Sequence, residues 1–245
     1  MSTSTTEPLF RDDAYNRSCT ANVVVNDLGG IVLDRTVFYP RGGGQPGDTG
    51  VLRSADGRAV EIATTVKGRD KDGGPDVIVH VPAEGQPALS VGEEISAEID
   101  WERRHKLMRV HTCLHLLSAV IEHPVTGGQV NDGKGRLDFA IPENNLVKEE
   151  VTAQLNALIA GNHPVTQDWI TDVELADQPD LVKTMSVKPP SGAGKVRLIR
   201  IEGQDLQPCG GTHVANTSEI GPVTVTKIES KGKQYRRVVI TLNEI

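Results

Sequence analysis

The sequence predicts an α+β protein with a β-rich N-terminal domain and a C-terminal domain that combines helices with an antiparallel sheet. Short runs rich in Val and Ile, separated by Gly, Pro and Asp, fill the first hundred residues. At Trp101 the pattern changes to a long stretch without Gly or Pro, and strand-like runs return after residue 195. We therefore expect a domain boundary close to residue 100, with one domain over residues 1–100 and another over residues 101–245.

The N-terminal domain is expected to be a small barrel or a sandwich, because its strand-like runs are short and regularly interrupted by turn residues. The expected strands are Asn22–Val25, Ile31–Leu33, Ala59–Ala63, Val77–Val81 and Ile95–Ile99. The polar segment Lys67–Pro75 is expected to form an exposed loop between two of them.

The clearest helix is expected from Trp101 to about His123. Apolar residues recur there at helical spacing, namely Leu107, Val110, Leu114, Leu117 and Ile121. The first half of the stretch keeps charged residues on the opposite side, whereas the second half is apolar nearly all round. This pattern predicts a helix that runs from the surface into the interior.

The remaining elements complete the second domain. A helix is expected from near Pro142 to Gly161, with Gly161 as a left-handed cap. The side chains expected to be buried on it are Leu146, Leu155, Leu158 and Ile159. A shorter helix is expected over Asp180–Met185. Strands at Val196–Ile201, Val223–Ile228 and Arg237–Leu242 predict helices packed on one antiparallel sheet.

Bulk composition limits the possible functions. The 245 residues are 37% hydrophobic and 24% charged, as in soluble globular proteins, and no window approaches the roughly 18 apolar residues of a membrane span. The N-terminus lacks the features of a secretory signal, so we expect a cytoplasmic protein. A formal net charge of -7 argues against a protein that coats nucleic acid indiscriminately. No lasting protein partner is evident.

The three cysteines favour thiol or metal chemistry over disulfides. They are odd in number and widely separated, in a chain long enough to fold without covalent links. Cys19 and Cys113 fit the role of small buried side chains, whereas Cys209 stands beside two glycines and a histidine.

Four side chains form a candidate metal site. His111 and His115 lie one turn apart on the same face of the expected helix, and Cys209 and His213 belong to a glycine-rich loop that can bend both toward one point. Nitrogen and sulfur donors in this combination favour one Zn²⁺ ion over magnesium or calcium. Thr112 replaces the Glu that a metalloprotease signature requires, so that class is excluded. An ordinary surface or core role is expected for His80, His105, His123 and His163.

A second conspicuous segment, residues 33–50, contains three consecutive glycines, Gly42, Gly43 and Gly44. They provide backbone freedom and close approach. The segment is not a phosphate-binding P-loop, because the Lys-Ser/Thr ending is missing.

Four ordered motifs together resemble those of a known family. They are Thr36–Gly50 (TVFYPRGGGQPGDTG), His111–Leu117 (HTCLHLL), Cys209–Pro222 (CGGTHVANTSEIGP) and Lys227–Arg237 (KIESKGKQYRR). From about Val32 to Leu242 the chain resembles the freestanding alanyl-tRNA editing proteins, the AlaX family, and the editing domain of alanyl-tRNA synthetase. Its length and N-terminal domain resemble the medium-sized branch of that family.

The resemblance implies an N-terminal β-barrel, a two-layer α/β editing domain and a hydrolase that removes serine from mischarged tRNA(Ala), with glycine as a second candidate. A site that hydrogen-bonds the serine hydroxyl disfavours alanine, which is the selectivity that editing needs. Thr36 matches the family position that lines the amino-acid pocket, and Gln45 matches one near the reactive ester. The resemblance therefore implies that both are catalytic and substrate-binding residues, and that Gly43 and Gly44 bring backbone close to the substrate.

The role of the metal stays open. His111, His115 and Cys209 are the firmest expected zinc ligands, and His213 is either the fourth ligand or a nearby base. Three protein ligands leave a position for water, whereas four leave none, so that the ion would anchor the pocket or the substrate.

The expected partner is the acceptor end of a mischarged tRNA, and two basic clusters are candidate phosphate contacts. The first cluster consists of Lys227, Lys231, Lys233, Arg236 and Arg237. The second consists of Arg103, Arg104, Lys106 and Arg109. Gly135–Phe139 also resembles the family, without an assigned role.

Two other functions fit the same motifs. One is a noncatalytic, zinc-stabilised module that binds tRNA ends. The other is editing of a different mischarged tRNA such as seryl-tRNA(Thr), since the related domain of threonyl-tRNA synthetase shares the histidine and cysteine pattern. The GGGQPGDTG segment favours the alanine branch.

Overall fold

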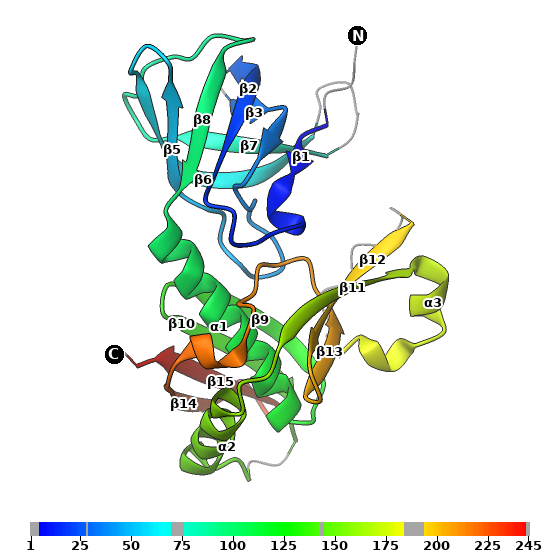
Figure 1. Cartoon of the computed structure of the whole chain (residues 1–245). Helices are drawn as coiled ribbons and strands as arrows, with labels where there is room; N and C mark the ends of the chain where they lie inside the picture. The colour runs from blue at the N-terminus through cyan, green and yellow to red at the C-terminus, as the bar shows by residue number, and fades with distance from the viewer. Residues whose placement is uncertain (1–4, 28, 70–75, 143–144, 184–193, 244–245) are drawn as a thin grey trace. The chain divides into compact units, whose positions relative to one another are not determined.

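Figure 1 shows the computed structural model of the chain, which describes residues 5–27, 29–69, 76–142, 145–183 and 194–243. The chain forms two compact units, Met1–His105 and Lys106–Ile245. Strands dominate the described residues and helices are fewer, so the α+β class predicted from the sequence is confirmed.

A closed antiparallel barrel of six strands forms the first unit. Its strands are β2 Ser18–Asp27, β3 Gly30–Leu33, β5 Gly50–Ser54, β6 Ala59–Arg69, β7 Asp76–Pro82 and β8 Glu94–Ile99. The order around the barrel is β2-β3-β7-β6-β5-β8, and β8 pairs again with β2. Ile95, Ala97 and Ile99 of β8 are buried while the residues between them are exposed, which is the alternation of a strand with one face in the core. Because the sheet closes on itself, this unit is a barrel and not a sandwich.

Short elements complete this unit. They are β1 Glu7–Pro8, which pairs in parallel with β4 Arg35–Thr36, and the 3-10 turn η1 Leu9–Arg11. The barrel core includes Val23, Ile31, Leu33, Phe38, Leu52, Ile62 and Ile95.

Two barrel strands differ from the sequence-based expectation. Strand β5 was not expected, because it begins at Gly50 within a run that reads as turns. A Cβ at Gly50 would lie 2.2 Å from the carbonyl oxygen of Glu98, so the β5–β8 pairing itself requires glycine. Strand β6 runs on to Arg69, so residues 67–69 belong to a strand and not to the expected loop. The rest of that loop, residues 70–75, lies outside the described residues.

The second unit contains two antiparallel sheets. The larger has the order β14-β15-β10-β9, with bounds β9 Val125–Asn131, β10 Lys134–Ala140, β14 Val223–Ser230 and β15 Tyr235–Leu242. The smaller has the order β11-β12-β13, with bounds β11 Val165–Thr171, β12 Lys195–Ile201 and β13 Asp205–Pro208. The helices are α1 Trp101–Val120, α2 Lys148–Ala160 and α3 Asp172–Ala176, with 3-10 turns η2 Pro179–Leu181 and η3 Thr217–Ile220.

The expectation of one sheet in this half of the chain is wrong. The sequence does not reveal four of these strands by an apolar pattern: β9 and β10 are interrupted by glycine, β13 has only four residues, and β11 is mostly exposed and polar. One such glycine, Gly135 of β10, lies against α1: a Cβ there would stand 2.6 Å from Cγ1 of Val110. Gly135–Phe139, the segment that resembled the family without an assigned role, therefore lies in β10. This is an inner strand of the larger sheet, and α1 packs closely against it.

Helix α1 matches the prediction in burial and ends slightly earlier, at Val120. Leu107, Val110, Leu114, Leu117 and Ile121 are buried. Every residue from Val110 to Ser118 is buried, so the helix does run into the interior.

Helix α2 starts later than expected and ends differently. It begins at Lys148, since residues 145–147 are not helical. Its buried residues are Val151, Leu155 and Ile159, whereas Leu146 and Leu158 are only half-buried. Gly161 has a right-handed conformation, and the left-handed residue is Asn162, with φ 54°. Asparagine tolerates this conformation better than other residues with a Cβ.

The third expected helix is replaced by smaller elements. Residues 179–181 form the 3-10 turn η2, and residues 184–193 lie outside the described part of the chain. The short helix α3 precedes it and begins with a capping box, in which Thr171 and Glu174 bond each other's backbone N–H groups.

Candidate metal centre

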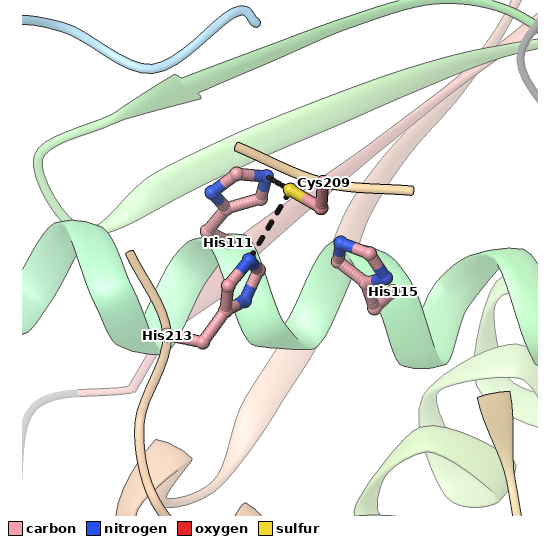
Figure 2. Close-up of side chains that lie close together, drawn as sticks. All are labelled: His111, His115, Cys209 and His213. Atoms are coloured by element: carbon pink, nitrogen blue, oxygen red, sulfur yellow. Dashed lines mark hydrogen bonds between the residues drawn. The ribbon is translucent and has the colours of Figure 1, made fainter. Parts of the chain in front are cut away.

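Four side chains from two distant parts of the chain meet beside α1 (Figure 2). His111 and His115 project from successive turns of α1, and Cys209 and His213 come from the loop that follows β13. Their candidate donor atoms all lie within 4.8 Å of one another. The three histidines are buried and Cys209 is half-buried. The structure thus brings together the four residues that the sequence singled out.

The distances within this cluster suit a tetrahedral zinc ion. With Zn–S about 2.3 Å and Zn–N about 2.0–2.1 Å, tetrahedral angles place sulfur and nitrogen about 3.6 Å apart. Sγ of Cys209 lies 3.6 Å from Nε2 of His111 and 3.3 Å from Nε2 of His213. The separations of Cys209 from His111 and His213 therefore suit shared zinc coordination, and three imidazoles with one thiolate fit zinc in donor chemistry.

Asp205 of β13 holds His115 in one orientation. Its carboxylate is fully buried, and Oδ2 accepts a hydrogen bond from Nδ1 of His115 at 2.9 Å. Nζ of Lys183 donates to Oδ1 at 2.8 Å, and Nε2 of Gln207 donates to both oxygens. Because an ionised carboxylate only accepts, Nδ1 of His115 stays protonated, which leaves Nε2 as the ring nitrogen that can bind a metal.

Thr112 likewise fixes the ring orientation of His213. Its hydroxyl donates to the carbonyl of Met108 at 2.9 Å, so its oxygen can only accept from Nδ1 of His213 at 3.2 Å. The proton of His213 therefore lies on Nδ1, and Nε2 faces Cys209. The same oxygen accepts from the Val214 N–H, which fixes the end of the loop against α1.

Arg197 of β12 holds the start of the loop. Its Nη1 donates to the carbonyls of Cys209 at 3.3 Å and Gly211 at 2.8 Å, and its own carbonyl accepts from the Cys209 N–H. The side chains that position the cluster, Thr112, Arg197 and Asp205, were not identified from the sequence. Only Asp205 carried a signal, as an acid four residues before Cys209.

The cluster favours an ionised cysteine among imidazoles. Burial opposes ionisation of Cys209, yet the adjacent His111 and His213 hold its pKa well below the ordinary value. Burial and the charge of His111 lower the pKa of His213 to about 3. Burial also disfavours protonation of His115, but Asp205 and Cys209 outweigh it and raise its pKa to about 10. A thiolate ready to coordinate is what binding of a soft divalent metal requires.

The glycine-rich residues expected at the site lie in the barrel unit. Gly43 and Gly44 have φ values of 56° and 83° and form the turn of a tight hairpin, in which Gly42 and Gln45 exchange backbone hydrogen bonds. The side chain of Gln45 is fully buried, as is that of Thr36. Both are therefore placed inside this unit, and their roles toward substrate stay predictions.

His80 was expected to be an ordinary histidine and is the hydrogen-bond partner of Thr36. Nε2 of His80 lies 2.8 Å from Oγ1 of Thr36, and Nδ1 lies 3.0 Å from the carbonyl of Ile31. Burial lowers the pKa of His80 to about 4, so the ring is neutral at pH 7. The proton on Nδ1 bonds Ile31, and Thr36 must donate its hydroxyl proton to Nε2.

Most cations at the start of α1 are engaged within the protein. Arg104 is fully buried and forms a forked ion pair with Asp48, with further bonds to the carbonyls of Ala14 and Val37. Arg109 donates to the carbonyl of Ile220. The expectation of a phosphate-binding cluster here is wrong for Arg104, because a fully buried guanidinium cannot reach a phosphate.

The C-terminal basic cluster is divided. Lys231 and Lys233 are exposed in the turn between β14 and β15. Arg237 instead pairs with Asp138 through two bonds of 2.7 and 2.8 Å, and Arg236 is buried and donates to backbone carbonyls. Lys231 and Lys233 are thus exposed members of the cluster, as is Lys227 of β14, which forms an ion pair with Glu229.

Comparisons with known proteins agree with this arrangement. Residues 196–239 match the family model of the threonyl and alanyl tRNA synthetase second additional domain. Residues 7–103 match the model of class II (A) tRNA synthetases. The barrel, the histidine and cysteine cluster and these matches define a protein related to the tRNA synthetases.

Full-length relatives identify the family. The chain is 37% identical to the alanyl-tRNA editing protein AlaX-M of Methanosarcina acetivorans, over 97% of this chain and 99% of that protein. It is 32% identical to AlaX-M of Saccharolobus solfataricus over the same shares. It is also 35% identical to the alanine–tRNA ligase of Sulfurisphaera tokodaii, over 91% of this chain but 25% of the ligase. The chain belongs to the family of alanyl-tRNA editing proteins, whose members are hydrolases that deacylate mischarged tRNA.

Among the described residues, no helix combines the length and apolar character needed to cross a bilayer.

Proposed function

We propose that the chain is a trans-editing deacylase of mischarged tRNA(Ala) that acts chiefly on seryl-tRNA(Ala), with glycyl-tRNA(Ala) as a second substrate, at a zinc-containing site. The observation that carries this proposal is the convergence of the donor atoms of His111, His115, Cys209 and His213 within 4.8 Å of one another, in a relative of alanyl-tRNA editing proteins. Residues 1–100 would form the barrel domain and residues 101–245 the editing domain of a cytoplasmic enzyme.

The four donors support zinc with His213 as the fourth ligand. Because Nδ1 of His213 bonds Thr112, only Nε2 can act, and one lone pair cannot both bind a metal and accept a proton from water. The separation of 3.3 Å between this nitrogen and Cys209 favours the ligand role. When bound, zinc supplies a positive charge that can hold the substrate and polarise the ester carbonyl.

Thr36 is the proposed source of selectivity for serine. Its hydroxyl proton is committed to His80, and its oxygen accepts from the Phe38 N–H at 3.1 Å, so only a further lone pair can meet a ligand. That lone pair would accept a hydrogen bond from a serine hydroxyl, which alanine lacks. The substitution Thr36→Val tests the assignment. We expect this substitution to reduce the preference for serine over alanine while hydrolysis continues.

The deciding experiment offers purified protein seryl-tRNA(Ala), alanyl-tRNA(Ala) and seryl-tRNA(Thr), with and without a chelator, and follows the released amino acid. We expect rapid release of serine from tRNA(Ala), slow release of alanine, and loss of activity with the chelator. Binding without release would indicate a noncatalytic module, and equal release of serine and alanine would exclude the proposed selectivity.

Cys209→Ser separates a functional ion from a purely structural one. We expect this variant to lose metal and hydrolysis while its circular dichroism spectrum stays folded. Cys19→Ser, in the barrel unit, is the matched control and should retain both. Unfolding of the Cys209 variant would indicate that the ion only stabilises the chain.

A further inference from the structure

Trp169 of β11 is an exposed aromatic residue without an assigned role. Its side chain is 47% exposed, whereas the other tryptophan, Trp101, packs against the barrel core. Large exposed apolar side chains are informative, since tryptophan is usually well buried. The position of Trp169 within its sheet relates this exposed side chain to the metal cluster.

The register of the small sheet puts Trp169 in one row with the metal cluster. Trp169 pairs directly with Arg197 of β12, and the Cys209 N–H donates to the Arg197 carbonyl, which extends the β12–β13 ladder by one residue. Directly opposed residues in an antiparallel sheet point to the same face. Trp169, Arg197 and Cys209 therefore share one face.

A hydrogen bond confirms the direction of Arg197. Its Nε donates to Oε1 of Gln167 at 2.8 Å, and Gln167 stands two residues before Trp169 and so on the same face. Asp168 points the other way and pairs there with Arg200. The positions beside Trp169 on its own face are Gln167, Thr171, Lys195, Arg197 and Ile199, none of which is acidic.

The spacing of the row matches a nucleotide. Two strand spacings separate Trp169 from Cys209, about 10 Å in total. One nucleoside spans this distance between the hydroxyls of its ribose and the far edge of its base. An ester bonded to the ribose could therefore lie at the metal cluster while the base reaches the indole ring.

We propose that Trp169 stacks on the base of the terminal nucleotide of the tRNA, with Lys195 and Arg197 supplying positive charge for its phosphate. This subsite rests on the proposed function, because the ester must lie at the metal cluster. Stacking on an aromatic ring tolerates any base and is the usual way in which proteins hold an unpaired nucleotide. Arg197 has two roles in this arrangement, since it also holds the carbonyls of the metal-binding loop.

Fluorescence of the protein with AMP as the probe tests the stacking directly. We expect AMP to quench tryptophan emission in the wild-type chain, and the quenching to disappear in Trp169→Phe, in which Trp101 still emits. Persistence of the same quenching in Trp169→Phe, or its absence in the wild type, would overturn the proposal. This measurement does not depend on hydrolysis.

Kinetics with seryl-tRNA(Ala) provide the second test. Trp169→Leu keeps an apolar side chain but no ring, and we expect kcat/KM to fall roughly 5- to 100-fold, mainly through KM. Trp169→Phe should retain most of the activity. Val173→Ala, which truncates another exposed apolar residue nearby, should match the wild type. Equal loss in the Phe and Leu variants, or no loss in either, would refute a stacking role.

The two proposals fail in different ways. If the wild-type chain releases no amino acid but AMP still quenches Trp169, the editing function fails and a nucleotide site remains. If the wild-type chain edits normally and Trp169→Leu is unchanged, the function stands and the subsite is refuted.

Discussion

The bond between Asp205 and His115 predicts a measurable loss of metal affinity in Asp205→Asn. The carboxylate accepts from His115, Lys183 and Gln207 at 2.8–2.9 Å and is fully buried. An asparagine of the same size offers a single acceptor oxygen. Its amide group must then face one of these donors, or force the proton of His115 onto Nε2 and so block the ligand atom.

The size of the effect follows from these contacts. Loss of the partner that orients a metal-bound histidine typically costs 10- to 100-fold in affinity. Because three donors depend on Asp205, two of them buried, we expect the upper end of that range, about 100-fold or about 2.7 kcal/mol. The apo protein should also be less stable, since Lys183 loses its buried partner.

Competition for zinc with a chromophoric chelator measures the affinity, and thermal melting of the apo protein measures the stability. Asp168→Asn is the matched control, because Asp168 is an exposed acid of the same sheet paired with Arg200. An Asp205→Asn protein that binds zinc as tightly as the wild type would refute the reasoning. So would an equal loss in the Asp168 variant.

Substitutions at three further residues test the fold. Arg104→Met leaves the carboxylate of Asp48 buried without its partner, so calorimetry should show a loss of about 3–5 kcal/mol, and a loss below about 1 kcal/mol would contradict the buried ion pair. Burial lowers the pKa of His80 to about 4 from 6.5, so this group contributes stability above pH 6.5 that is lost as pH falls toward 4, by roughly 3 kcal/mol. His80→Gln should flatten this part of the acid unfolding curve, and an unchanged curve would exclude His80 as the cause. Asn162→Gly should be as stable as the wild type or more so, whereas Asn162→Ala should lose about 1 kcal/mol because of its left-handed backbone; equal melting temperatures for the two would count against that conformation.

The sequence predicted those parts of the fold whose residues carry a local pattern. The strands around Ile31 and Ile95 have alternating or continuous apolar residues, and α1 has an uninterrupted helical period. Gly50 and Gly135 mislead such reasoning. Each reads as a turn signal, yet each lies in a strand where a neighbouring strand or helix comes too close for a Cβ.

The cluster itself could be predicted because its four donors form two short motifs. The residues that orient the donors could not, because Asp205 meets His115 across 90 positions of sequence and Arg197 meets the loop through backbone carbonyls. Runs of basic residues predicted the phosphate contacts least reliably. Arg104 stands in a basic run that looks exposed, and only the fold shows that Asp48 faces it inside the protein.

The distance along the chain between the two halves of the cluster has a consequence for biosynthesis. The histidines of α1 leave the ribosome long before Cys209, from which His111 is separated by 98 positions. Until then a metal ion finds only two nitrogen donors, which hold it weakly. Capture of the proposed zinc ion must therefore be among the last events in maturation of the second unit, and a chain truncated before Cys209 should emerge without it.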